Sequence, residues 1–133
     1  MDRPLRSPTD PGPIAVISQS GATAGFIAAL AQQQEIGLNH LISTGNEADL
    51  DGATFANHLL DDPRVRTVAM FIESVRMPHN FIAAAQKACA LSKAIVALKI
   101  GLSDVTARSA QAHTGSLVGD DRVFEGICRQ FGG

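Results

Sequence analysis

The chain has no tryptophan, no tyrosine and only two cysteines among its 133 residues. Its only aromatic side chains are six phenylalanines, so it offers no obvious platform for stacking a flavin ring or the bases of single-stranded nucleic acid. Two separated cysteines, Cys89 and Cys128, are too few for a disulfide scaffold or a metal cluster. We interpret them as the thiols of a cytoplasmic protein and predict no metal site.

A charge excess of one sign and a long hydrophobic run are also missing. Eleven Lys and Arg face 13 Asp and Glu, and the formal net charge of −2 provides no basic surface for nucleic acid or an anionic membrane. No apolar run approaches the roughly 18–20 residues that cross a bilayer. Residues 1–6 lack the apolar core of a signal peptide. We therefore expect a cytoplasmic protein with no nucleic-acid or membrane partner.

Short apolar runs alternate with amphipathic segments along the chain. Residues 1–12 contain three of the six prolines, and we interpret them as a linker or tail before one domain at 13–133. Continuous apolar runs predict buried strands, and apolar residues at helical spacing predict helices between them. The predicted strands are 14–17, 41–42, 68–72 and 94–98. The predicted buried helix faces are Phe26, Ile27, Leu30 and Ala31; Phe55, Ala56, Leu59 and Leu60; and Phe81, Ile82, Ala85, Ala88 and Cys89.

Strands separated by single helices predict an α/β fold in which helices cover both faces of a parallel sheet, a three-layer αβα arrangement. We expect Gly37 to end the first helix and Asp51 to cap the second. A loop of small residues is expected at 103–119, and a last helix at about 121–131. The chain stops where a further strand would be natural, so we expect a piece excised from a longer polypeptide.

Polar residues and glycines follow the predicted strands. Ligands of open parallel sheets bind beyond the carboxyl ends of the strands. Ser20 and Gly21 lie at the start of the first helix, whose free N–H groups suit a phosphate; the alternative is that the serine only caps the helix. Gly45 and Asn46 follow the second strand, and Glu73 follows the third.

His113 lies in the small-residue loop. A neutral imidazole is a competent nucleophile toward phosphorus, and a carboxylate on its far nitrogen would fix its tautomer. An isolated loop histidine is more often a surface residue, which is how we interpret His40, His58 and His79. His113 differs from them because it would lie beside a rim that suits phosphate.

Four motifs in register resemble the NDP-forming acyl-CoA synthetases, specifically the flavodoxin-like second domain of the alpha-type part of succinyl-CoA synthetase. The resemblance covers about residues 13–132. It implies a flavodoxin-like open parallel sheet. The motifs are Ser18-Gln19-Ser20-Gly21, Ser43-Thr44-Gly45-Asn46-Glu47, Phe71-Ile72-Glu73 and His113-Thr114-Gly115-Ser116.

The resemblance also implies a reaction. An acyl-CoA and phosphate give an acyl phosphate, whose phosphoryl group passes to a histidine and then to a nucleoside diphosphate; the reverse direction makes acyl-CoA. His113 would carry the phosphoryl group, and Glu73 would orient it. Ser20, Gly21, Gly45, Asn46, Thr114 and Gly115 would hold the phosphoryl group.

The domain alone would bind no cofactor and complete no turnover. The full enzyme would use CoA, ATP or ADP, and Mg²⁺. Its partners would be a CoA-binding Rossmann-type domain and an ATP-grasp domain or subunit, and the resemblance leaves room for an oligomer.

Two other functions compete with this interpretation. The turn at Ser18–Thr23 would also suit the phosphate of FMN, although a flavin usually stacks on aromatic side chains that this chain lacks. A synthetase-like regulatory domain of a protein acetyltransferase would keep the fold without catalysis, but such domains tend to lose the histidine.

Overall fold

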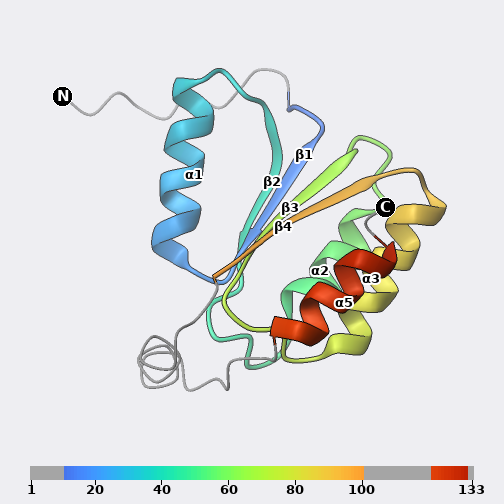
Figure 1. Ribbon diagram of the computed structural model, residues 1–133. Helices are drawn as coiled ribbons and strands as arrows, with labels where there is room; N and C mark the ends of the chain where they lie inside the picture. The colour runs from blue at the N-terminus through green and yellow to red at the C-terminus, as the bar shows by residue number, and fades with distance from the viewer. Residues whose placement is uncertain (1–10, 101–120, 132–133) are drawn as a thin grey trace.

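In the computed structural model, which describes residues 11–100 and 121–131, a parallel sheet lies between helices (Figure 1). The strands are β1 (Ile14–Ser18), β2 (Leu38–Ser43), β3 (Thr67–Ile72) and β4 (Ala94–Lys99), in the order β2-β1-β3-β4. All three neighbouring pairs are parallel. The helices are α1 (Gly21–Gln33), α2 (Gly52–Leu59), α3 (Pro78–Ala90) and α5 (Asp121–Phe131). The predicted α/β class and three-layer arrangement are confirmed.

The helices divide unevenly between the two faces of the sheet. Figure 1 shows α1 on one side and α2, α3 and α5 together on the other. The strand order reverses between β1 and β3, because the chain moves from β1 to one neighbour and later crosses to the other. Doubly wound sheets of this kind bind ligands beyond the carboxyl ends of the strands at such a switch point. The fold therefore directs attention to the turns that follow β1 and β3.

The main core lies between the sheet and the group of α2, α3 and α5. Alternate residues of each strand point into it, which follows from the two-residue period of a β-strand. Phe81 of α3 also packs against Phe124 of α5, with ring centroids 5.4 Å apart. The largest side chains of this core are Ile17, Leu59, Leu60, Val65, Val68, Met70, Ile72, Phe81 and Ile127.

The first helix differs from its predicted burial pattern. Phe26 is 70% exposed and Leu30 is also exposed, whereas the buried residues of α1 are Ala24 and Ala31. The prediction was correct for Ala31 and wrong for Phe26 and Leu30, because small side chains fill the space between α1 and the sheet. The helix ends at Gln33 rather than near Gly37, and the following Glu35 has a left-handed φ of 57°.

The α1 face of the sheet is only partly covered by the described helices. Ile95 and Ala97 of β4 pack against the main core, so the alternate residues Val96 and Leu98 point to the opposite face. Leu98 is 65% exposed there. The prediction that helices cover both faces is therefore correct for the part of the sheet beneath α1. The described helices do not cover the same face of β4.

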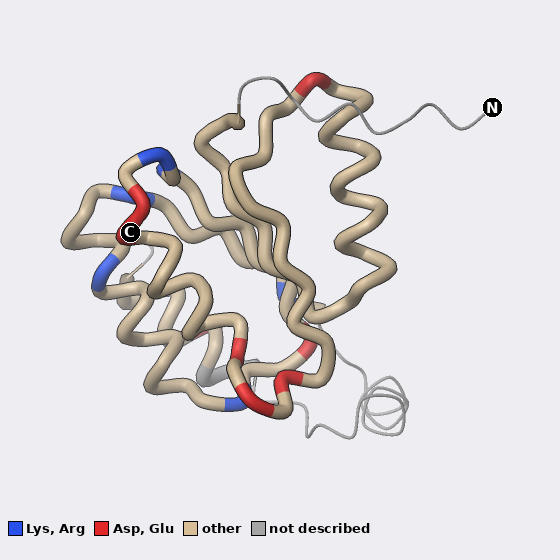
Figure 2. Tube along the Cα trace, turned by 180° about the vertical axis from the view of Figure 1, so that it is seen from behind, with Lys and Arg blue, Asp and Glu red and all other residues tan. Residues whose placement is uncertain are grey.

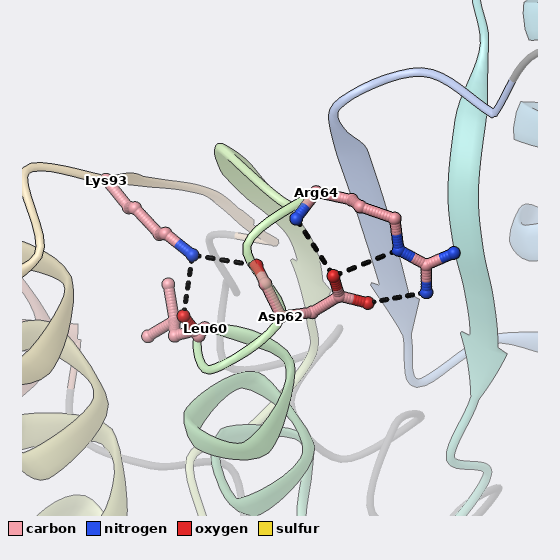
Figure 3. A network of polar contacts seen from close by, with 4 residues as sticks. All are labelled: Leu60, Asp62, Arg64 and Lys93. Carbon is pink, nitrogen blue, oxygen red and sulfur yellow. Dashed lines mark hydrogen bonds and ion pairs between the residues drawn. The ribbon is translucent and has the colours of Figure 1, made fainter.

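A polar network lies at the amino end of the sheet, where α2 ends and β3 begins (Figure 3). Lys93 Nζ donates to the carbonyls of Leu60 at 2.7 Å and Asp62 at 2.8 Å, so a cation satisfies backbone acceptors at the helix C-terminus. Arg64 donates to Asp62 through its backbone N–H, Nε and Nη2. These hydrogen bonds lower the pKa of Asp62 to about 2. This end has lysine–carbonyl hydrogen bonds and an Arg64–Asp62 ion pair, and it carries none of the predicted site residues.

Candidate functional site

Two serines in the turn after β1 make the hydrogen bonds that cap the N-terminus of α1. Ser18 Oγ donates to the carbonyl of Ser20 at 2.8 Å, and Ser20 Oγ accepts from the N–H of Thr23 at 3.2 Å. Ser20 is therefore the N-cap of α1. The first turn of a helix has no intrahelical partners for its N–H groups, and here they face the carboxyl end of the sheet. Gly21 is exposed at this position, so its backbone can be closely approached.

The loop after β2 is folded around the carboxylate of Glu47. Glu47 is 7% exposed, and its Oε1 accepts from the N–H of Gly52 at 2.7 Å and from Thr44 Oγ1 at 3.0 Å. Gly45 and Glu47 both have left-handed φ angles, of 60° and 56°. Gly52 is the first residue of α2, so the buried negative charge lies at a helix N-terminus, where it is favoured.

Asp51 caps α2 as predicted. Its Oδ1 accepts from the N–H of Thr54 at 2.8 Å and from Thr54 Oγ1 at 2.6 Å. The loop is thus fixed at both ends, by Glu47 and by Asp51. Gly45 and Asn46 occupy its exposed tip, where the amide oxygen of Asn46 accepts from the N–H of Ala48 at 3.3 Å.

The turn after β3 is held by a side chain from the turn after β1. Gln19 Oε1 accepts from the N–H of Glu73 at 2.5 Å and from the N–H of Ser74 at 3.0 Å. Gln19 Nε2 donates to the carbonyl of Ser74 at 2.7 Å. One amide therefore satisfies three backbone groups that lie beyond the end of the strand pairing.

Arg76 joins the turn after β3 to the loop after β2. Its Nη1 donates to the carbonyls of Asn46 at 2.9 Å and Glu47 at 2.8 Å. The hydrogen bonds of the described residues do not use Arg76 Nε or Nη2, which leaves three N–H donors of the guanidinium at this rim. Sequence reasoning missed Arg76, because no spacing rule connects it to a glycine-containing loop 30 residues earlier.

These three segments form the walls of a shallow hollow at the carboxyl end of the sheet. Glu73, Gly45 and Asn46, which the sequence singled out, all line it. Figure 2 shows that acidic residues gather at this end of the molecule, with basic residues among them. The residues that line the hollow are Gln19, Gly45, Asn46, Glu47, Glu73, Ser74 and Arg76.

The predicted site residues are thus only partly brought together. Ser20 and Gly21 lie at the same end of the sheet, but they do not line this hollow. His113, Thr114 and Gly115 lie outside the described residues, and so does the predicted loop at 103–119. Within 11–100 and 121–131, no three His, Cys, Asp or Glu side chains are grouped so that they could hold a metal ion.

Comparison with known proteins assigns this architecture to a family. Residues 11–133 match the family described as succinyl-CoA ligase like flavodoxin domain. The chain belongs to this family. The resemblance in the four sequence motifs is thereby confirmed.

Relatives of the chain include ADP-forming acetate–CoA ligases. The alpha subunit of ADP-forming acetate–CoA ligase I from Pyrococcus furiosus is 38% identical over 127 residues, which are 94% of this chain and 27% of that protein. ADP-forming acetate–CoA ligase from Methanocaldococcus jannaschii is 35% identical over 121 residues, or 91% of this chain and 17% of that protein. The chain therefore spans about a quarter or less of these relatives.

A solved structure has the same fold. Dinucleotide-forming acetyl-coenzyme A synthetase 1 from Ca. Korarchaeum cryptofilum, in complex with phosphate and ADP, superposes with a TM-score of 0.77 and 31% identity. The match covers 92% of this chain and 26% of that one. The flavodoxin-like fold expected of the succinyl-CoA ligase-like domain is confirmed. Among residues 11–100 and 121–131, none of the helices has the length and hydrophobicity needed to span a membrane.

Proposed function

We propose that this domain carries the phosphohistidine of an ADP-forming acyl-CoA synthetase. The acyl-CoA thioester reacts with phosphate to give an acyl phosphate and free CoA. His113 then attacks phosphorus and releases the carboxylic acid. ADP takes the phosphoryl group from the histidine to form ATP. In the opposite direction the same steps make acyl-CoA from acid, CoA and ATP.

The observation that supports this function is the meeting of three distant segments in the hollow beyond β1 and β3. Glu73 stands there beside Gly45 and Asn46. In the proposed reaction Glu73 accepts a hydrogen bond from one imidazole nitrogen of His113. The other nitrogen then remains the nucleophile, and the carboxylate stabilises the charge formed on the ring.

The surrounding groups suit a phosphoryl group. A phosphoryl group brings about −1.5 to −2 charges near neutral pH, so it needs N–H donors and positive charge. The first turn of α1 supplies the N–H of Gly21 beside the Ser20 hydroxyl, whereas the N–H of Ser20 already donates to Ser18 Oγ at 3.2 Å; Arg76 supplies a cation. We propose that Asn46, Gly45, Thr114 and Gly115 complete this cradle. The carboxylates of Glu47 and Asp51 compete little with a phosphoryl group for the N–H donors of α1 and for Arg76. Both already accept hydrogen bonds from the first turn of α2.

The rest of the reaction would belong to other domains. We propose a CoA-binding Rossmann-type domain and an ATP-grasp domain or subunit as partners, because the relatives are several times as long as this chain. Mg²⁺ would accompany the nucleotide there, because it binds to the oxygens of the nucleotide phosphates. An enzyme that makes acyl-CoA from acid, CoA and ATP, or runs the reverse reaction, is expected in the cytoplasm.

The test is phosphorylation of the full-length protein with labelled ATP and Mg²⁺. The wild type should acquire acid-labile, alkali-stable label, and His113→Ala should acquire none. Glu73→Gln should be labelled about 100-fold more slowly, the usual scale for a lost acid–base partner. His79→Ala is the matched control, because His79 is an exposed histidine at the start of α3. An unlabelled wild type would refute the phosphohistidine and favour a regulatory domain.

A further inference from the structure

The amide of Gln19 continues the sheet past the point where backbone pairing stops. The last backbone hydrogen bond between these segments runs from the N–H of Gln19 to the carbonyl of Phe71, at 3.1 Å. Beyond it, the chains after β1 and β3 separate, because the first enters α1 and the second turns toward α3. The Gln19 side chain spans the gap and bonds the N–H groups of Glu73 and Ser74 and the carbonyl of Ser74.

This arrangement makes specific demands on the residue at position 19. Ser74 is 7% exposed, so its backbone groups have little water to replace a lost partner. The contact requires an acceptor for two adjacent N–H groups and a donor for one carbonyl on the same planar group, which an amide provides. Glutamate lacks the donor, methionine has the length without either function, and asparagine is one methylene shorter.

We propose that Gln19 is the positioning residue for Glu73. The inference rests on the proposed function, in which Glu73 orients His113. The N–H of Glu73 itself is one of the three bonded groups, so the Glu73 backbone cannot move away from β1 without breaking the contact. A displacement of about 1 Å in an orienting group lowers reaction rates by roughly 100-fold. Gln19 thereby couples the phosphate-facing turn after β1 to the carboxylate after β3.

The first measurement tests the geometry without any reaction. Amide hydrogen exchange at Glu73 and Ser74 should be about tenfold faster in Gln19→Met than in wild type, because the N–H groups lose their acceptor. Gln19→Glu keeps an acceptor and should retain most of the protection. Gln33→Met makes the same chemical change at an exposed position in the last turn of α1, and it should leave exchange at these two residues unchanged.

The second measurement tests the catalytic consequence in the full-length protein. The rate of phosphohistidine labelling should fall about 10- to 100-fold in Gln19→Met and stay unchanged in Gln33→Met. If Gln19 acts through Glu73, then adding Gln19→Met to Glu73→Gln should slow labelling no further. A simple loss of stability would instead slow both backgrounds by the same factor.

The outcomes separate the two proposals. A wild type that is never labelled refutes the proposed function, and the catalytic part of this inference falls with it. A labelled wild type whose Gln19→Met variant is labelled at the normal rate overturns the role of Gln19 alone. The role of Gln19 is also overturned if the double variant is labelled more slowly than Glu73→Gln by the full factor that Gln19→Met causes alone. Gln19 would then affect labelling independently of Glu73.

Discussion

The buried carboxylate of Glu47 should determine the stability of the loop that presents Gly45 and Asn46. In Glu47→Ala the N–H of Gly52 loses a charged acceptor at 2.7 Å, and Thr44 Oγ1 loses one at 3.0 Å. A hydrogen bond to a charged group contributes about 1.5–3 kcal/mol, and a hydroxyl that can turn to water loses about 0.5–1 kcal/mol. The free energy of unfolding should therefore fall by about 2–4 kcal/mol.

A conservative variant and a matched control refine this expectation. Glu47→Gln keeps an oxygen acceptor but loses the charge, and it should cost about 1 kcal/mol because neutral bonds are roughly half as strong. Glu35→Ala is the control, because Glu35 has nearly the same left-handed φ, 57° against 56°, but is exposed. It should change stability by less than about 0.5 kcal/mol.

Urea unfolding followed by far-ultraviolet circular dichroism is the appropriate assay, since the chain has no tryptophan to report by fluorescence. With a typical dependence on urea, Glu47→Ala should lower the midpoint by about 1–2 M. A midpoint shift no larger than that of Glu35→Ala would refute the structural role given to Glu47. It would mean that water replaces the carboxylate at the start of α2.

Two further predictions concern the loss of stability at acidic pH and the packing of α5 on α3. The Asp62–Arg64 contact holds the pKa of Asp62 near 2, below its ordinary 3.8, so its contribution to stability is complete above about pH 4 and is lost as pH falls toward 2. Asp62→Asn and Arg64→Met should both flatten the fall of the urea midpoint over this range, and a fall as steep as in wild type would contradict the contact. A double-mutant cycle with Phe81→Ala and Phe124→Ala should give a coupling of about 0.5–1.5 kcal/mol by thermal unfolding, and zero coupling would argue against α5 packing on α3.

The sequence predicted the order of elements well where local signals were strong. Continuous apolar runs predicted β1, β3 and β4, and Asp51 was correctly assigned as the cap of α2. The predicted burial of Phe26 and Leu30 in α1 was wrong and that of Ala31 was correct, because periodicity shows which residues share a helix face but not which of them contact the sheet. Alanines face the sheet in α1, and Phe26 faces solvent.

For the candidate site, the sequence determined which residues follow each strand, and the parallel topology then placed Gly45, Asn46 and Glu73 at one rim. Only the tertiary structure showed that Gln19 and Arg76 tie these turns together. The physical reason is one of range. Strands, helices and caps are set by neighbours a few residues apart, whereas these two side chains bond backbone groups 55 and 30 residues away, which become neighbours only after the sheet has formed.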